Sequence, residues 1–185
     1  MIPVTSRTSP EAAVRYPREI AAAVTLPAAC AALVTHRPGP LLAREAIAVL
    51  TACGALAPRL ALLAFLTARD RPDPRSVVPF DPFHDPTPPA LHGAGPEPDR
   101  DRVRTAGDRC AAAWQWWRAE DRSADTAVGA AGALATASWC AWALGSGARA
   151  ETRARYALET RSDDPLAGLV LRSVRAGSAP AWERR

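Results

Sequence analysis

Residues 141–177 read AWALGSGARAETRARYALETRSDDPLAGLVLRSVRAG, and this stretch predicts a helical hairpin. A Gly-Ser-Gly sequence at residues 145–147 ends one helix, because glycine favours the backbone conformation of a turn. The next helix, at about residues 148–160, repeats small apolar residues at helical spacing. An aspartate then precedes Pro165 at the start of another helix, which ends at Gly177. Local signals and periodicity therefore agree on helix, turn and helix.

The same spacing of apolar residues continues toward the N-terminus. It predicts further helices at about residues 101–117, 125–144, 17–35, 41–53 and 58–67. Pro27 is expected to kink or split the helix at 17–35, since proline removes a backbone donor. No stretch alternates apolar and polar residues with the period of a strand. The sequence therefore predicts an all-α fold, a helical bundle that ends in a helix hairpin.

The character of the sequence changes between residues 71 and 100. Nine of the chain's eighteen prolines fall in these thirty residues, and proline opposes both helix and central strand. We therefore expect an N-terminal Ala-rich helical segment at residues 1–70 and a C-terminal helical domain at 99–185. The part between them, residues 71–98, is either a mobile linker or a strap that docks on the helices through its few apolar side chains.

The basic residues reflect coding bias as much as function. All 23 are arginine, lysine and asparagine are absent, and alanine and proline are abundant. Codons for lysine and asparagine are AT-rich, so this pattern indicates a GC-rich genome, typical of an actinobacterium. A net charge of +4 on 185 residues is modest, and nucleic-acid-binding proteins usually carry a clustered basic stripe. The composition alone therefore does not favour nucleic-acid binding.

The cysteines and the N-terminus predict a cytoplasmic protein. The four cysteines are far apart, lie in apolar runs and lack metal-ligand spacing, which is typical of buried reduced thiols. The first twenty residues show no early apolar core after a basic end, so we expect no signal peptide. Residues 126–148 are uncharged, but small residues dominate them, so we expect a bundle helix and no membrane partner.

Part of the hairpin is similar to a tetratricopeptide unit. A helix, a turn with glycine and a second helix with Ala150 and Ala157 are followed by Leu158-Glu159. Small residues at these positions let two antiparallel helices approach closely. Ser162 stands where such a unit usually has proline, and nothing repeats with a period of 34 residues. The resemblance implies a single tetratricopeptide-like helix hairpin, and not an array.

A longer segment, about residues 114–182, resembles the C-terminal part of an actinobacterial family, domain of unknown function family 4192. The residues that carry this resemblance are Ala141-Trp142, Gly145, Gly147-Ala148, Ala150, Ala157-Leu158-Glu159, Leu166-Ala167, Ala176-Gly177 and Pro180. The N-terminal Leu-Leu-Gly-Phe-x-Pro-type motif of that family does not occur in this sequence. The resemblance implies a helical fold and an actinobacterial host, but no activity, cofactor or substrate.

No residue pattern in the chain indicates catalysis, a cofactor or a metal. The three histidines lie in loops without ligand spacing, and no nucleophile motif such as G-x-S-x-G occurs. Most tryptophans have the spacing of a buried helix face, but we expect Trp116 and Trp182 to be exposed. Together with Arg149, Arg153 and Arg172 on the last helices, they form our predicted interaction surface.

These features favour a non-catalytic protein–protein interaction module that binds an unidentified protein through its C-terminal helix pair. The alternative is a nucleic-acid-binding accessory protein that uses the arginines of residues 148–175. The two hypotheses differ in whether these arginines are unpaired on one face. The acidic residues interspersed among them, Glu151 and Glu159 for example, favour the first hypothesis.

Overall fold

The computed structural model describes residues 10–35, 39–120 and 122–184, which form α-helices, short 3-10 helices and loops without a strand. The prediction of an all-α helical bundle is confirmed. The α-helices are α1 (Pro10–Val34), α2 (Ala43–Ala52), α3 (Leu56–Thr67), α4 (Arg100–Glu120), α5 (Ala124–Ala143), α6 (Gly147–Thr160) and α7 (Pro165–Arg175). The 3-10 helices are η1 (Pro74–Ser76), η2 (Pro89–His92) and η3 (Ala181–Glu183).

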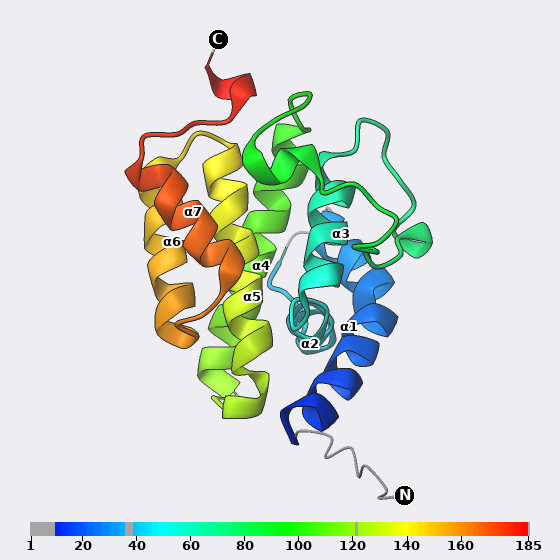
Figure 1. Ribbon diagram of the computed structural model, residues 1–185. Helices are drawn as coiled ribbons and strands as arrows, with labels where there is room; N and C mark the ends of the chain where they lie inside the picture. Colours follow the sequence, from blue (N-terminus) through cyan, green and yellow to red (C-terminus); the bar gives the residue numbers. More distant parts are fainter. Residues whose placement is uncertain (1–9, 36–38, 121, 185) are drawn as a thin grey trace, which may run out of the picture.

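Helix α5 lies in the middle of the bundle, between the pair α6–α7 and the N-terminal helices (Figure 1). Every residue from 129 to 143 is buried, and most of them are alanine, glycine or serine. Small side chains let several helices approach one axis, and α5 contacts α2, α3, α4, α6 and α7. The uncharged stretch of the sequence is thus the core helix of the bundle.

Two glycines of α5 allow the end of α2 to approach at backbone distance. A Cβ atom added to Gly129 would overlap the carbonyl oxygen of Leu50, and one added to Gly132 would overlap that of Cys53. Both obstacles are backbone atoms, so no side-chain rotation could relieve the overlap. The packing of α2 on α5 therefore requires glycine at these two positions.

The C-terminal hairpin begins and ends where the sequence predicts. Gly145 has a φ of 74° in the turn before α6, a conformation that costs glycine little. Asp164 caps α7, because its Oδ1 accepts hydrogen bonds from the backbone of Leu166 (3.1 Å) and Ala167 (3.0 Å). Pro165 is the first residue of the helix. Helices α5 and α6 pack on each other across this turn, and α7 packs on both, which confirms the predicted hairpin.

Helix α1 differs from the prediction at its prolines. It continues from Pro10 to Val34 with Pro17 and Pro27 inside it, whereas Pro27 was expected to kink or split it. Leu26, Cys30 and Leu33, around Pro27, are fully buried, and α1 packs on α2 and α4. We attribute the unbroken helix to this packing, which offsets the hydrogen bond that proline cannot donate.

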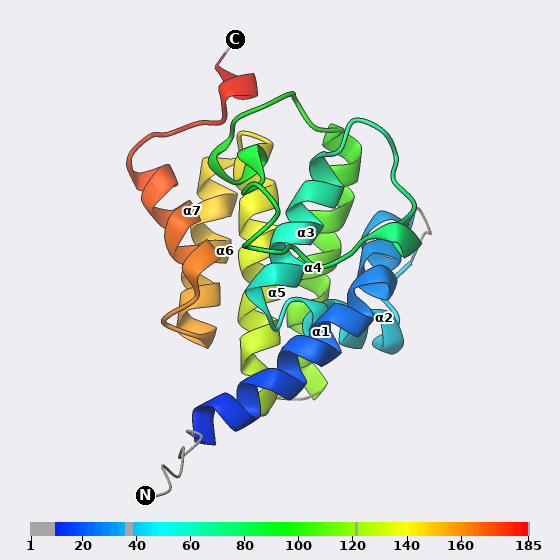
Figure 2. The same ribbon diagram turned by 45° about the vertical axis from the view of Figure 1, so that its right-hand side comes forward.

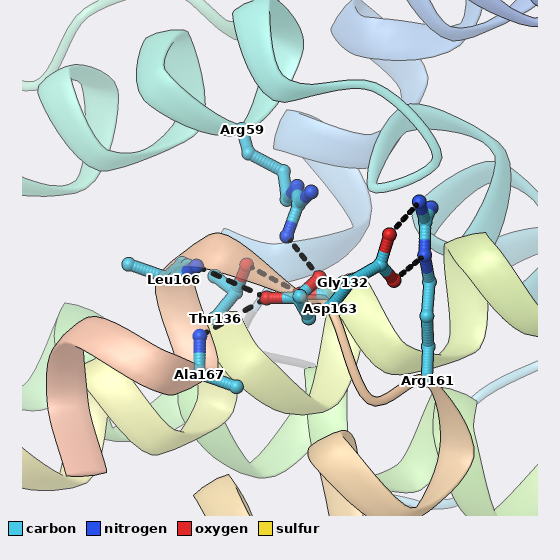
Figure 3. A network of polar contacts seen from close by, with 8 residues as sticks. Arg59, Gly132, Thr136, Arg161, Asp163, Leu166 and Ala167 are labelled. Carbon is cyan, nitrogen blue, oxygen red and sulfur yellow. Dashed lines mark hydrogen bonds and ion pairs between the residues drawn. The ribbon is translucent and has the colours of Figure 1, made fainter.

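Both halves of the chain contribute to one core. Arg59 of α3 pairs with Asp164, the cap of α7, at 2.6 Å, and the two side chains are 4% and 1% exposed. Figure 3 shows this pair between α3 and the start of α7, beside Gly132 and Thr136 of α5. Trp114, Trp139 and Trp142 of the C-terminal half belong to the same apolar cluster as Leu62 and Leu66 of the N-terminal half.

The proline-dense segment lies along α3 (Figure 2). Phe80 donates a backbone hydrogen bond to the carbonyl of Ala57 at 3.3 Å. At the end of α3, the buried side chain of Arg102 from α4 donates hydrogen bonds to the carbonyls of Leu66 and Ala68. We call residues 72–96 the strap, and they cover one side of α3.

One described stretch, Pro17–Val34 of α1, is long and apolar enough to cross a membrane, and 33% of it is buried in the bundle. Helices α2 and α3 would pass the same test only as a pair bent by 111°. Core helices of soluble proteins often have such a composition. The sequence alone draws attention to residues 126–148, which form the buried helix α5, and to residues 46–68, where it predicts two helices that meet at a break, as α2 and α3 do.

We expect Gly132→Ala to destabilise the protein strongly. The added methyl group would overlap the backbone carbonyl of Cys53, and forced overpacking of a core costs about 3 kcal/mol. Gly168→Ala in α7 is the matched control, since only the mobile end of the Arg172 side chain lies nearby, at 3.2 Å. Alanine should there raise the free energy of unfolding by about 0.5–1 kcal/mol. Chemical denaturation measures both changes, and equal midpoints would contradict the close approach.

Candidate functional site

A cavity lies between α3 and the strap, and we call it the strap groove. It has a volume of about 570 Å³. Representative lining residues are Leu60, Ala64 and Phe65 of α3 and Val77, Val78 and Phe80 of the strap. Thr67, Ser76 and Asp85 are the polar side chains among the lining residues. The groove is therefore suited to apolar groups.

Short-range hydrogen bonds shape the strap. Asp73 caps η1 by accepting from the backbone of Arg75 at 2.9 Å. Asp81 accepts from the backbone of Phe83 at 2.9 Å and contacts Nδ1 of His84 at 2.6 Å. These contacts lower the pKa of the Asp81 carboxyl group, and the hydrogen bond with His84 has the largest effect. With prolines that fix φ, they hold the strap without regular secondary structure.

A second hollow, which we call the arginine pocket, lies between α4 and the turn that leads into α6. It has a volume of about 160 Å³. Its charged lining consists of Arg100, Arg104 and Asp108 from α4 and Arg149 and Arg153 from α6. The structure thus brings two residues of the predicted interaction surface, Arg149 and Arg153, into one site. Their partners on α4 were missed, because nothing local in the sequence indicates which helix faces α6.

The other predicted surface residues lie elsewhere. Arg172 is exposed on α7 and does not line the arginine pocket. Trp116 is half-buried and lines a third hollow of about 330 Å³, together with Ile47 and Leu50 of α2 and Thr126 of α5. The predicted surface is therefore not one continuous patch.

The prediction that Trp182 is exposed was wrong. Its side chain is 6% exposed, and its Nε1 donates to the carbonyl of Ala143 at 2.8 Å. The backbone of Ala181 donates to the carbonyl of Gly93 at 2.8 Å. The reason is that the end of α5 leaves unpaired carbonyls and apolar surface, which η3 covers. The sequence feature that could have indicated this burial is a large apolar residue, Trp182, in an otherwise polar tail.

The four cysteines lie on four parts of the bundle and are all buried. Burial raises the pKa of the Cys30 thiol to about 12 and that of the Cys140 thiol to about 12. A hydrogen bond between the Cys110 and Cys53 thiols, together with burial, also raises the pKa of Cys110. Among the residues that the structure describes, no three His, Cys, Asp or Glu side chains are arranged to hold a metal ion.

No protein-family model, curated protein sequence or solved structure matches this chain. We therefore infer function from the geometry of the strap groove and the arginine pocket.

Replacing Trp182 with alanine should lower the free energy of unfolding by about 3–5 kcal/mol, because it removes a large buried side chain. Trp182→Phe keeps most of the side-chain volume but removes the hydrogen bond to Ala143. It should lower the free energy of unfolding by about 1 kcal/mol. Trp116→Ala, at a half-buried position, should cost less than Trp182→Ala. Thermal and urea unfolding measure these differences, and the opposite order would restore an exposed Trp182.

The native thiols should resist alkylation. At about pH 8, near the pKa of an ordinary thiol, raised pKa values keep Cys30, Cys110 and Cys140 protonated, and burial blocks the reagent at all four cysteines. We expect no iodoacetamide adduct on the folded protein by mass spectrometry and four adducts in denaturant. Rapid labelling of a folded sample would show that the bundle opens locally around the thiols.

Proposed function

We propose that this protein is a non-catalytic protein–protein interaction module whose strap groove holds apolar side chains of a partner protein. The volume and lining of the groove carry this proposal. Ligand pockets are mostly apolar and occupy about 300–1,000 Å³, and the groove of about 570 Å³ lies in that range. Its few polar groups suit orientation of a bound segment better than catalysis.

Exposed apolar side chains at the groove support a protein partner. Val78 lines the groove and is 72% exposed, and Phe83, on the same strap, is 90% exposed. Exposed apolar patches commonly mark interaction sites. Prolines restrict the strap before binding, which reduces the entropy that the complex must lose.

The groove replaces the hairpin as the proposed contact site. The sequence alone predicts that the partner binds in the groove of the C-terminal helix pair, which includes α6. The small face of α6, with Ala150, Ala154 and Ala157, is fully buried within the bundle. This face is used in the packing of the bundle, so it is not open to a partner. We therefore assign partner binding to the strap groove.

The nucleic-acid alternative has weaker support. Of the arginines on the last two helices and their connection, Arg153, Arg155, Arg161 and Arg175 each pair with a nearby carboxylate. Paired arginines offer less charge to a phosphate backbone. A gel-shift series at rising salt tests this alternative, and salt-sensitive binding of duplex or single strands would favour it.

Two further predictions remain part of the proposal. We propose a cytoplasmic location, supported by four buried free cysteines, since disulfides are rare in that compartment. We also propose a relationship to the C-terminal part of domain of unknown function family 4192. The residues between Ala141 and Pro180 that carry the resemblance support this proposal.

The test is photo-crosslinking from position 78 in cells that express the protein. A photoreactive phenylalanine at Val78 should capture a discrete partner, which is then identified and purified. Ala64→Trp should fill the groove from an exposed position on α3 and weaken binding of that partner by tenfold or more, by about 1.4 kcal/mol. Ala119→Trp, at an exposed position of α4 outside the groove, is the matched control.

Calorimetry with the purified partner gives the deciding comparison. Equal affinities for the wild type and Ala64→Trp would overturn the groove as the contact site. Turnover of a substrate by the wild-type protein, lost in Ala64→Trp, would replace the module with an enzyme. Circular dichroism of each variant checks that the helices are retained.

A further inference from the structure

We infer that the arginine pocket binds a phosphate-class dianion, either inorganic phosphate or the phosphoryl group of a small monoester. Four arginines from two helices line a hollow of about 160 Å³. Like charges in one small space repel each other, and an anion among them lowers the energy. Arginine also matches the oxygens of phosphate with paired N–H donors.

Two of the arginines are held in place by the protein. Arg153 donates to the carbonyl of Ala137 at 3.1 Å and to Asp108 Oδ1 at 2.9 Å. Asp108 is the one carboxylate among the lining residues. These contacts fix one wall of the pocket and use part of the arginine's donor set.

A second part of the lining, at Arg100, is fixed in a similar way. Arg100 pairs with Glu97 at 3.2 Å and with Glu183 of η3. It also donates to the carbonyl of Leu144, at the end of α5, at 3.3 Å. The charge of Arg100 is therefore balanced by carboxylates, and its main effect is to position this side of the pocket.

The charges of the other two arginines, Arg104 and Arg149, are less strongly balanced by the protein. Arg149 forms no hydrogen bond or ion pair with any described residue. Among the described residues Arg104 pairs with Asp101 alone, and both side chains of that pair are exposed. An exposed pair of this kind contributes little in water. Arg104 and Arg149 are therefore the groups that a bound anion would recruit.

The start of α6 departs from the usual pattern of a helix N-terminus. Its first turn contains no acidic residue, and the side chain of Ser146 does not cap it. Arg149 occupies that first turn, although a cation is unfavourable at the positive end of the helix dipole. The free N–H groups of this turn add donors to the arginine side chains. An anion in the pocket would accept hydrogen bonds from these N–H groups and would also balance the charge of Arg149.

The size of the pocket defines the ligand class. A space of about 160 Å³ is below the range of about 300–1,000 Å³ that is usual for whole organic ligands. It suits a single tetrahedral anion, with any organic part outside. Phosphate monoesters gain their second negative charge around pH 6, so the affinity should rise with pH between about pH 5 and pH 7.

Isothermal titration of the full chain, at matched ionic strength, tests the site with inorganic phosphate, phenyl phosphate and sulfate. We expect saturable binding with one site per chain. Arg149→Gln and Arg104→Gln should each weaken it about tenfold, as expected for a lost charged hydrogen bond. Arg172→Gln removes an exposed arginine outside the pocket and is the matched control. It should bind like the wild type.

Ser146→Asp gives an independent check, since it places a carboxylate at the pocket while keeping a good capping residue. It should abolish saturable binding in a protein that remains folded. Tighter binding of phenyl phosphate than of inorganic phosphate identifies a monoester as the source, and the reverse order identifies the free ion. Absence of wild-type binding, or an equal loss in Arg172→Gln, would overturn the inference. Each outcome is independent of partner binding at the strap groove.

Discussion

The arrangement of this bundle depends on the backbone-to-backbone approach of α2 and α5. Gly129 and Gly132 lie directly against the carbonyl oxygens of Leu50 and Cys53. Since α3 begins soon after Cys53, this approach also places the side chain of Arg59 over Gly132. Arg59 then reaches Asp164, the cap of α7. One short interhelical distance thus positions the N-terminal helices, the central helix and the C-terminal hairpin.

The Arg59–Asp164 pair determines how the two halves fit together more than it adds to stability. Desolvation offsets much of the attraction in a buried ion pair, whereas removal of one partner leaves an uncompensated charge. Two backbone hydrogen bonds compensate for the desolvation of Asp164. The buried Nε of Arg59, by contrast, has no partner among the described atoms. Any arrangement that buried Arg59 and Asp164 apart from each other would leave two uncompensated charges, so the pair favours this packing.

Local interactions made the helices predictable, and contacts distant in sequence decided the rest. The cap at Asp164 and the turn at Gly145 depend on neighbouring residues and could be predicted. The burial of Trp182 depends on a carbonyl 39 residues earlier. The Arg153–Asp108 contact in the arginine pocket spans 45 residues. Sequence periodicity shows which face of a helix is apolar, but it does not show which helix lies opposite.

The contacts of η3 have a consequence for synthesis on the ribosome. Residues 178–183 are made after all seven helices, yet they supply Trp182 to the end of α5, Ala181 to the loop at Gly93 and Glu183 to Arg100. Until they emerge, an apolar surface beside the strap stays uncovered, and such surfaces attract chaperones or other nascent chains. Residues 178–183 therefore act as a closing step of folding, and a chain cut short before residue 178 would form the helices but leave this surface uncovered.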